Sequence, residues 1–143
     1  MDYVSSTLNK NIKKSIKDIY DFDVNNVPLE HPDNEKFGDY STSVSLIISK
    51  KLKKIPLDIA KEISKDLNHR DIYFENNYGK YPLFSSIEAV SPGFINFKFS
   101  DLFLKNQISE VLDKGDTFGS NIRGEGKIII IEFSAPIRTN LFT

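Results

Sequence analysis

Apolar residues recur at helical spacing along the first half of the chain. Residues 3–20 place apolar side chains three or four positions apart with lysines between them, which predicts an amphipathic helix. A second helix is predicted from near Ser41. Pro56 ends it and begins a third, because proline suits the first helical position, although Ile55 offers no side-chain oxygen as a cap. The three apolar stripes are Val4, Leu8, Ile12, Ile16 and Ile19; Val44, Ile47, Ile48 and Leu52; and Ile59, Ile63 and Leu67.

A strand with two unlike faces is predicted at residues 94–99, FINFKF, directly after a shorter strand at 85–90. Successive side chains of a strand point to opposite faces. One face is therefore an ordinary apolar core face, made of Ile95, Phe97 and Phe99. The other face should be reached by water although it carries an aromatic ring, an amide and a cation, which are those of Phe94, Asn96 and Lys98.

The remaining elements of the first 117 residues are a loop, a hairpin and a fourth helix. Residues 24–32 contain two prolines, which limits them to an edge strand or a loop. The aromatic stretch 70–84 has a turn pattern at Asn76–Gly79 and predicts a hairpin. Ser100 is a suitable N-cap for a helix that ends at Gly115. The side chains of this helix that we expect to point inward are Leu104, Ile108, Val111 and Leu112.

A domain boundary is predicted near residue 118. Residues 116–126 are polar, contain three glycines and show no periodicity, as in a linker. The run KIIIIEF at 127–133 is continuously apolar, which is typical of a parallel strand buried on both faces. The predicted fold is thus α+β over residues 1–117, a small and mostly antiparallel sheet packed against about four helices. Residues 118–143 would be a linker and the first strand of a second domain.

Composition narrows the classes of protein. The chain has 143 residues and no cysteine, so disulfides, thiolate metal sites and cysteine nucleophiles are excluded. No apolar run approaches the roughly 20 residues of a membrane span, and the N-terminus lacks the apolar core of a signal peptide, so we expect a cytoplasmic protein with no membrane partner. The net charge of −1 gives no overall attraction to nucleic acid, so any such contact needs a local patch.

The polar residues predict neither a metal site nor a catalytic residue. His31 and His69 stand alone, without a partner at the spacing of metal ligands. The stretch GEGK at 124–127 is not a phosphate-binding loop, because Asn121 occupies the position of its first glycine and Ile128 that of its Ser or Thr.

Two features leave alternatives open. Six lysines lie between residues 50 and 65, opposed by Asp58 and Glu62, and they form either a solvated helix face or a patch that contacts phosphates. Phe94 and Asn96 either complete the packing of the domain or bind an unstacked base, with the ring stacking on the base and the amide pairing with its edge.

Three stretches resemble arginyl-tRNA synthetases, in the same order and at about the same spacing. They are GDYSTSVSLIISKKLKKIPLDIAKEISKDL (38–67), VSPGFINFKFS (90–100) and IIIEFSAPIRTNLFT (129–143). The third is similar to the lead-in to the class I HIGH motif of that family. It departs from the family pattern at Ile137 and at Asn140–Leu141.

The resemblance implies that residues 1–117 are the N-terminal appended domain, which contacts the D-loop at the elbow of arginine tRNA. Phe94 and Asn96 would contact a D-loop base, and the other implied tRNA-binding residues are Lys98, Lys50, Lys51, Lys53 and Lys54. Residues from about 127 would be the first strand of the Rossmann catalytic domain. Ser134 would lie near the sites for arginine and ATP.

The implied parent protein is a monomeric ligase that attaches arginine to its tRNA using ATP and Mg²⁺. This chain alone is expected to bind neither ATP nor Mg²⁺ and to have no aminoacylation activity, because it lacks the HIGH motif and most of the catalytic domain. Two alternatives remain. One is a free-standing RNA-binding or regulatory module derived from the same domain, and the other is a purely structural domain in which Phe94 belongs to the core.

Overall fold

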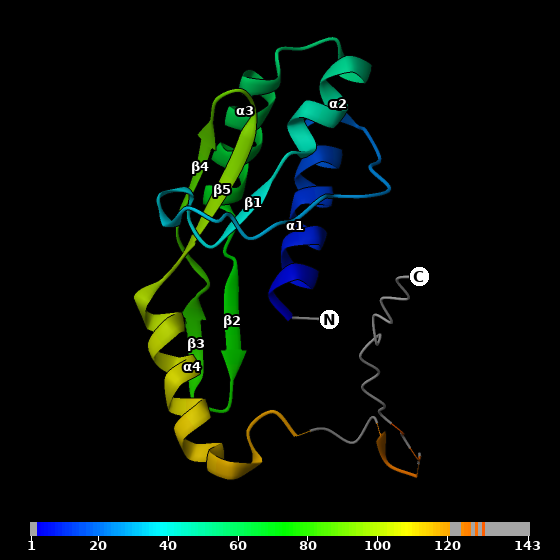
Figure 1. Ribbon diagram of the computed structural model, residues 1–143. Helices are drawn as coiled ribbons and strands as arrows, with labels where there is room; N and C mark the ends of the chain where they lie inside the picture. Colours follow the sequence, from blue (N-terminus) through cyan, green and yellow to red (C-terminus); the bar gives the residue numbers. More distant parts are fainter. Residues whose placement is uncertain (1–2, 121–123, 127, 129, 131–143) are drawn as a thin grey trace, which may run out of the picture.

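The computed structural model describes residues 3–120, 124–126, 128 and 130. These residues form an α+β fold (Figure 1). The helices are α1 (Tyr3–Tyr20), α2 (Val44–Leu52), α3 (Pro56–His69) and α4 (Asp101–Lys114), with 3₁₀ turns η1 (Glu35–Phe37) and η2 (Gly115–Thr117). The strands are β1 (Tyr40–Thr42), β2 (Tyr73–Asn76), β3 (Gly79–Pro82), β4 (Phe84–Val90) and β5 (Phe94–Phe99).

Two antiparallel sheets build the domain. The larger has the strand order β1-β5-β4, so the predicted strand 94–99 is its centre. In its register Asn96 lies between Ser41 on β1 and Glu88 on β4. The smaller sheet is the hairpin of β2 and β3, which confirms the hairpin predicted at 70–84.

Helices cover one face of the larger sheet. α3 packs against β4 and β5, and α1 packs on α3, as Figure 1 shows. The predicted core residues of α1 and α3 are buried where they face this layer, and Ile95 and Phe97 are fully buried. The segment that precedes β1 crosses the opposite face of the sheet (Figure 1), and Glu30 pairs with Ser41 there. The two faces of the sheet therefore differ as the alternation in β5 predicts.

The start of the second helix differs from the prediction. α2 begins at Val44 rather than near Ser41, because residues 40–42 form strand β1. The Thr42 hydroxyl accepts a hydrogen bond from Val44 N (3.3 Å) and donates one to Pro28 O (2.6 Å), which fixes the passage from strand to helix. Ile47, expected in the apolar stripe, is exposed, whereas the stripe residues Val44 and Ile48 are buried.

The prediction for the inward face of α4 was wrong. Ser100 does cap the helix, since its Oγ accepts from Phe103 N (3.0 Å). Phe103 and Asn106 are the residues of α4 that are buried. The stripe predicted to face inward is exposed, namely Leu104, Ile108, Val111 and Leu112. The reason is that α4 packs beside the narrow hairpin strand β3 (Figure 1), so only one narrow side of the helix faces the rest of the domain.

The predicted second domain lies almost wholly outside the described residues. This applies to most of the run 127–133 and to Ser134. Within the described part of the chain, no helix is long and apolar enough to cross a membrane.

Candidate nucleic-acid interface

The open face of the larger sheet brings together the residues that the alternation in β5 singles out. Phe94 and Asn96 are half-buried and Lys98 is exposed. The Ser41 hydroxyl donates to Asn96 Oδ1 at 2.9 Å. This bond occupies the amide oxygen of Asn96, and the amide nitrogen is the donor of that side chain.

A hollow of about 260 Å³ opens beside Phe94 and Asn96. Its walls include Glu30 and Phe37 from the segment before β1, and Ser41 forms part of its lining. The volume is slightly below that of pockets for drug-sized ligands, roughly 300–1,000 Å³. It therefore suits a small planar group such as one nucleobase.

The loop that carries Phe37 is fixed by the sheet beneath it. Gly38 has φ 82° and ψ −164°, a conformation that other residues rarely adopt, and its N–H donates to Glu35 O at 3.1 Å. A Cβ on Gly38 would lie 2.5 Å from the carbonyl oxygen of Phe97. Asp39 then anchors the loop to β5, because its carboxylate accepts from Phe99 N at 2.7 Å.

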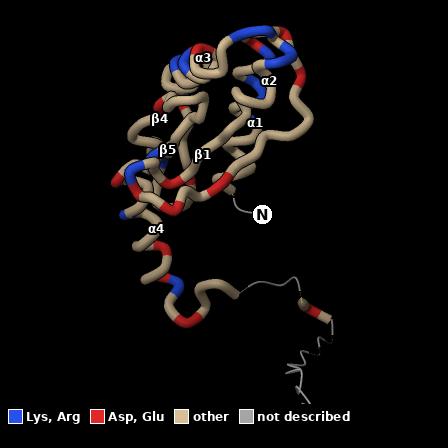
Figure 2. The backbone as a smooth tube through the Cα atoms, turned by 45° about the horizontal axis from the view of Figure 1, so that its top comes forward, with Lys and Arg blue, Asp and Glu red and all other residues tan. Residues whose placement is uncertain are grey.

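The lysines of residues 50–54 lie where α2 passes to α3. The turn between β4 and β5 packs against the start of α3, since a Cβ on Gly93 would lie 2.7 Å from Cβ of Pro56. Pro56 lies two residues after Lys54, so the lysine-rich segment is joined in sequence to the part of α3 that packs against this turn. Figure 2 shows basic residues gathered where α2 passes to α3.

The four lysines are not equivalent. Lys54 Nζ forms an ion pair with Glu62 (3.2 Å) and lies 4.9 Å from the ring centre of Tyr20. The Tyr20 hydroxyl also donates to Glu62, and this bond, together with Lys54, lowers the pKa of that carboxyl. Lys51 Nζ lies 5.7 Å from the centre of the Phe22 ring. All four lysines are exposed, and Lys50 and Lys53 are the two without an ion pair or an aromatic ring contact among the described interactions.

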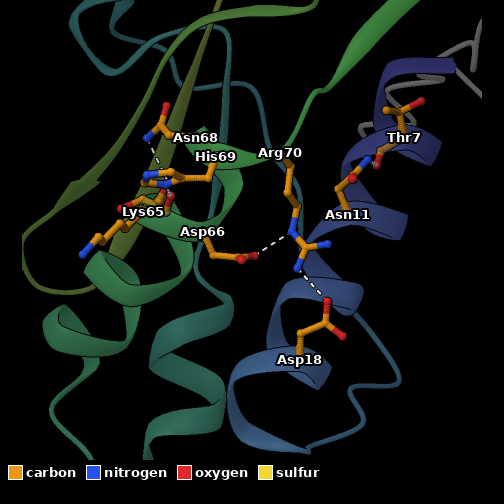
Figure 3. Close-up of polar contacts among 9 residues, drawn as sticks. Thr7, Asn11, Asp18, Lys65, Asp66, Asn68, His69 and Arg70 are labelled. Carbon is orange, nitrogen blue, oxygen red and sulfur yellow. Dashed lines mark hydrogen bonds and ion pairs between the residues drawn. The ribbon is translucent and has the colours of Figure 1, made fainter.

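A second polar cluster, on the helical side, serves the fold. Arg70 follows α3 and donates to Asp66 (2.6 Å) and to Asp18 of α1 (2.7 Å), as Figure 3 shows. Partial burial raises the pKa of Asp66, but the hydrogen bond and positive charge of Arg70, together with smaller contributions from Ser15 and His69, outweigh this effect and the net pKa is lowered. The cluster ties α1 to α3 and lies on the face of the sheet away from Asn96.

Three residues of the open face were missed from the sequence. Glu30, Phe37 and Ser41 line the hollow, yet the periodicity of β5 says nothing about which loop lies over it. The Gly-Asp pair at 38–39 is a local turn signal, and it marks the loop that presents Phe37. The described residues contain no group of His, Asp or Glu that could hold a metal ion.

Comparison with known proteins agrees with the geometry of this domain. The sequence model of the arginyl tRNA synthetase N-terminal domain matches residues 6–99. An arginine–tRNA ligase of Thermotoga petrophila is 33% identical over 138 residues, which are 96% of this chain and 23% of that protein. The chain belongs to the arginyl-tRNA synthetase N-terminal domain family. The resemblance stated from the three sequence stretches is thereby confirmed.

Further relatives extend the match to solved folds. An arginine–tRNA ligase of Thermotoga maritima is 36% identical over 115 residues, or 80% of this chain and 19% of that protein. The Thermus thermophilus and Plasmodium falciparum arginyl-tRNA synthetase structures align with TM-scores of 0.53 and 0.59. They cover 71% and 78% of this chain at 19% and 18% identity, which supports the shared fold. The chain spans about a fifth of the length of these relatives.

Proposed function

We propose that residues 3–117 are the part of an arginine–tRNA ligase that holds the elbow of arginine tRNA, with the open face of the sheet binding a D-loop base. The hollow of about 260 Å³ beside Phe94 and Asn96 carries this proposal. An exposed aromatic ring stacks on any base, and a primary amide pairs with a base edge. Unpaired bases occur in RNA loops, which makes a loop the natural target.

The charges around the hollow favour a base over a phosphate inside it. Glu30 lines the hollow, and a carboxylate repels phosphate but accepts hydrogen bonds from base amino groups. Phosphates would instead meet Lys50 and Lys53 at the neighbouring end of α2, and Lys98 further along β5. Base and backbone contacts would thus be made by different, adjacent parts of the surface.

Arginine, ATP and Mg²⁺ belong, in this proposal, to the catalytic domain of the longer enzyme, which would act in the cytoplasm as a monomer. The N-terminal domain itself makes no contact with ATP or Mg²⁺ in this proposal. This chain should therefore show no arginine-dependent exchange of pyrophosphate into ATP. Measurable exchange by the 143-residue chain would contradict the assignment.

The test of the base site is the affinity of this chain for arginine tRNA, measured at several salt concentrations. Phe94→Ala should weaken binding by about 5- to 100-fold, as the loss of one stacked base predicts. Asn96→Ala should also weaken it. This variant leaves the hydroxyl of Ser41 without its partner, so the double variant Ser41→Ala/Asn96→Ala serves as the control for that structural effect.

The lysine contacts call for a separate measurement. Lys50→Ala and Lys53→Ala should weaken binding equally for all RNA sequences and reduce the salt dependence, by roughly 0.7–0.9 in the logarithmic slope per phosphate lost. Lys14→Ala, an exposed lysine on α1 behind the helical layer, is the matched control and should change neither quantity. Binding that is indifferent to Phe94→Ala and to changes in the D-loop would refute the proposed function.

A further inference from the structure

Phe37 stands between two hollows on the open face of the sheet. The first is the hollow of about 260 Å³ that holds Phe94. The second has a volume of about 400 Å³ and is lined by Lys36, Glu88 and Lys98, among others. Phe37 and Asn96 line both. The ring of Phe37 can therefore serve as a partition between the two neighbouring cavities, which also share Val90 and Asn96.

The partition is held in place although it is exposed. The Phe37 ring belongs to a residue that is 47% exposed, so its burial contributes little to the core. Its backbone is nevertheless fixed, since Phe37 N donates to Asn34 O at 2.9 Å. Gly38 beside it fits tightly against the carbonyl of Phe97. Phe37 shares a hollow with Phe94, so two aromatic side chains line the same part of the open face.

The two hollows differ in chemistry. The first is bounded by aromatic and aliphatic surface with a single carboxylate, that of Glu30. The second contains both signs of charge, from Lys36 and Lys98 on one hand and Glu35 and Glu88 on the other. Such a mixture suits a nucleotide, whose phosphate meets the ammonium groups while its base donates to a carboxylate.

We propose that Phe37 is a wedge that separates two consecutive nucleotides of the bound strand, with one base in each hollow. The inference rests on the proposed function, since it takes the D-loop strand as the ligand. The first base stacks on Phe94 and the second lies beyond Phe37, near Lys98 and Glu88. Asn96, at the shared floor, is within reach of either base. The domain then reads a dinucleotide rather than a single base.

Double-mutant cycles between protein and RNA test this inference. The protein variants are Phe37→Ala, Phe94→Ala and, as a matched exposed phenylalanine, Phe118→Ala (52% exposed). The RNA variants are arginine tRNAs with one abasic residue at each D-loop position in turn. Phe37→Ala should weaken binding at least about fivefold and Phe37→Tyr should restore it, because both rings stack.

The pattern of coupling decides the outcome. Phe37→Ala should weaken binding to intact tRNA but have no further effect when either of two adjacent D-loop positions is abasic. Phe94→Ala should lose its effect on affinity at only one of these two positions. Phe118→Ala should not change the affinity for any of the tRNAs. Coupling of Phe37 to no position, or to the same single position as Phe94, would overturn the wedge and leave the base site standing. If Phe94→Ala itself changes nothing, both the wedge and the proposed function are overturned. Equal thermal midpoints of the variants would confirm that the differences arise in binding.

Discussion

Gly38 is the residue whose replacement by alanine should damage this domain most for the smallest chemical change. The added methyl group would lie 2.5 Å from the carbonyl oxygen of Phe97 and 3.0 Å from its carbonyl carbon. Both atoms belong to the central strand β5 and cannot move like the end of a flexible side chain. The same carbonyl accepts the hydrogen bond from Asp39 N (2.8 Å) that aligns the chain with β5 at the start of β1.

The expected cost can be built from three contributions. The backbone conformation of Gly38 costs a residue with a side chain about 1–3 kcal/mol. Displacing the loop weakens the bond to the Phe97 carbonyl, worth about 1–3 kcal/mol if that group is left unpaired. The loss of flexibility in the unfolded chain offsets about 0.4–1 kcal/mol. Gly38→Ala should therefore destabilise the domain by about 3 kcal/mol, a large share of a typical total of about 5–15 kcal/mol.

Thermal and urea unfolding of the two proteins measure this difference, with Gly119→Ala as control. Gly119 has nearly the same φ (83° against 82°), but a Cβ there would meet nothing within 4 Å. Gly119→Ala should lose about 1–3 kcal/mol less than Gly38→Ala, because it shares the backbone strain and the unfolded-state contribution but displaces no hydrogen bond to a strand carbonyl. If both variants lost the same small amount, the close approach to β5 would not be what requires glycine at position 38.

Three further substitutions test other parts of the fold. Arg70→Met should destabilise by about 1–2 kcal/mol, since the ion pairs with Asp66 and Asp18 are only partly buried. Because the pKa of Asp66 is lowered in the folded state, its contacts stabilise the fold at pH values above the unfolded pKa near 3.8, and this stabilisation is lost as the pH falls through the folded pKa. In urea titrations, the difference in stability between Arg70→Met and wild type should therefore narrow below about pH 4. Ser100→Ala should cost about 1 kcal/mol by removing the cap of α4, and Ser100→Thr should retain most of it in thermal melts. Thr42→Val should cost about 1–3 kcal/mol by leaving Pro28 O without its donor, a loss that chemical denaturation would show and Thr42→Ser would spare.

Elements with long periodic patterns were predictable, and short or lightly packed ones were not. α1 and α3 have enough apolar repeats for the period to identify both the element and its inward face. Strand β1 has three residues, which is too few for alternation to show, so its residues were merged with the following helix. In α4 the period identified the helix but not its inward side, because a helix that rests on a hairpin buries little of its surface.

The part of the candidate site that lies on β5 could be predicted from the sequence, because the strand itself could be predicted. Alternation along β5 placed Phe94, Asn96 and Lys98 on the open face, where the structure has them. The contribution of Phe37 and Glu30 depends on a loop that crosses the sheet far from β5 in sequence, and such tertiary contacts leave no local pattern. Likewise, the lysine count could not reveal that Lys54 is paired with Glu62.

The division of the sheet into a packed face and an open face makes the functional tests interpretable. Phe97→Ala, on the packed face, would remove a fully buried ring at a cost of about 3–5 kcal/mol. Much of the domain would then be unfolded, so a loss of binding by this variant would say nothing about contacts with the ligand. Phe94 is the preceding aromatic position of the same strand on the other face, is only half-buried and has a hollow beside it. Its truncation should therefore leave stability nearly unchanged, and a loss of affinity in that variant reports on the ligand. Because Phe37 is exposed on the same face, the argument applies to it as well, whereas Ser41 is buried and needs its paired control.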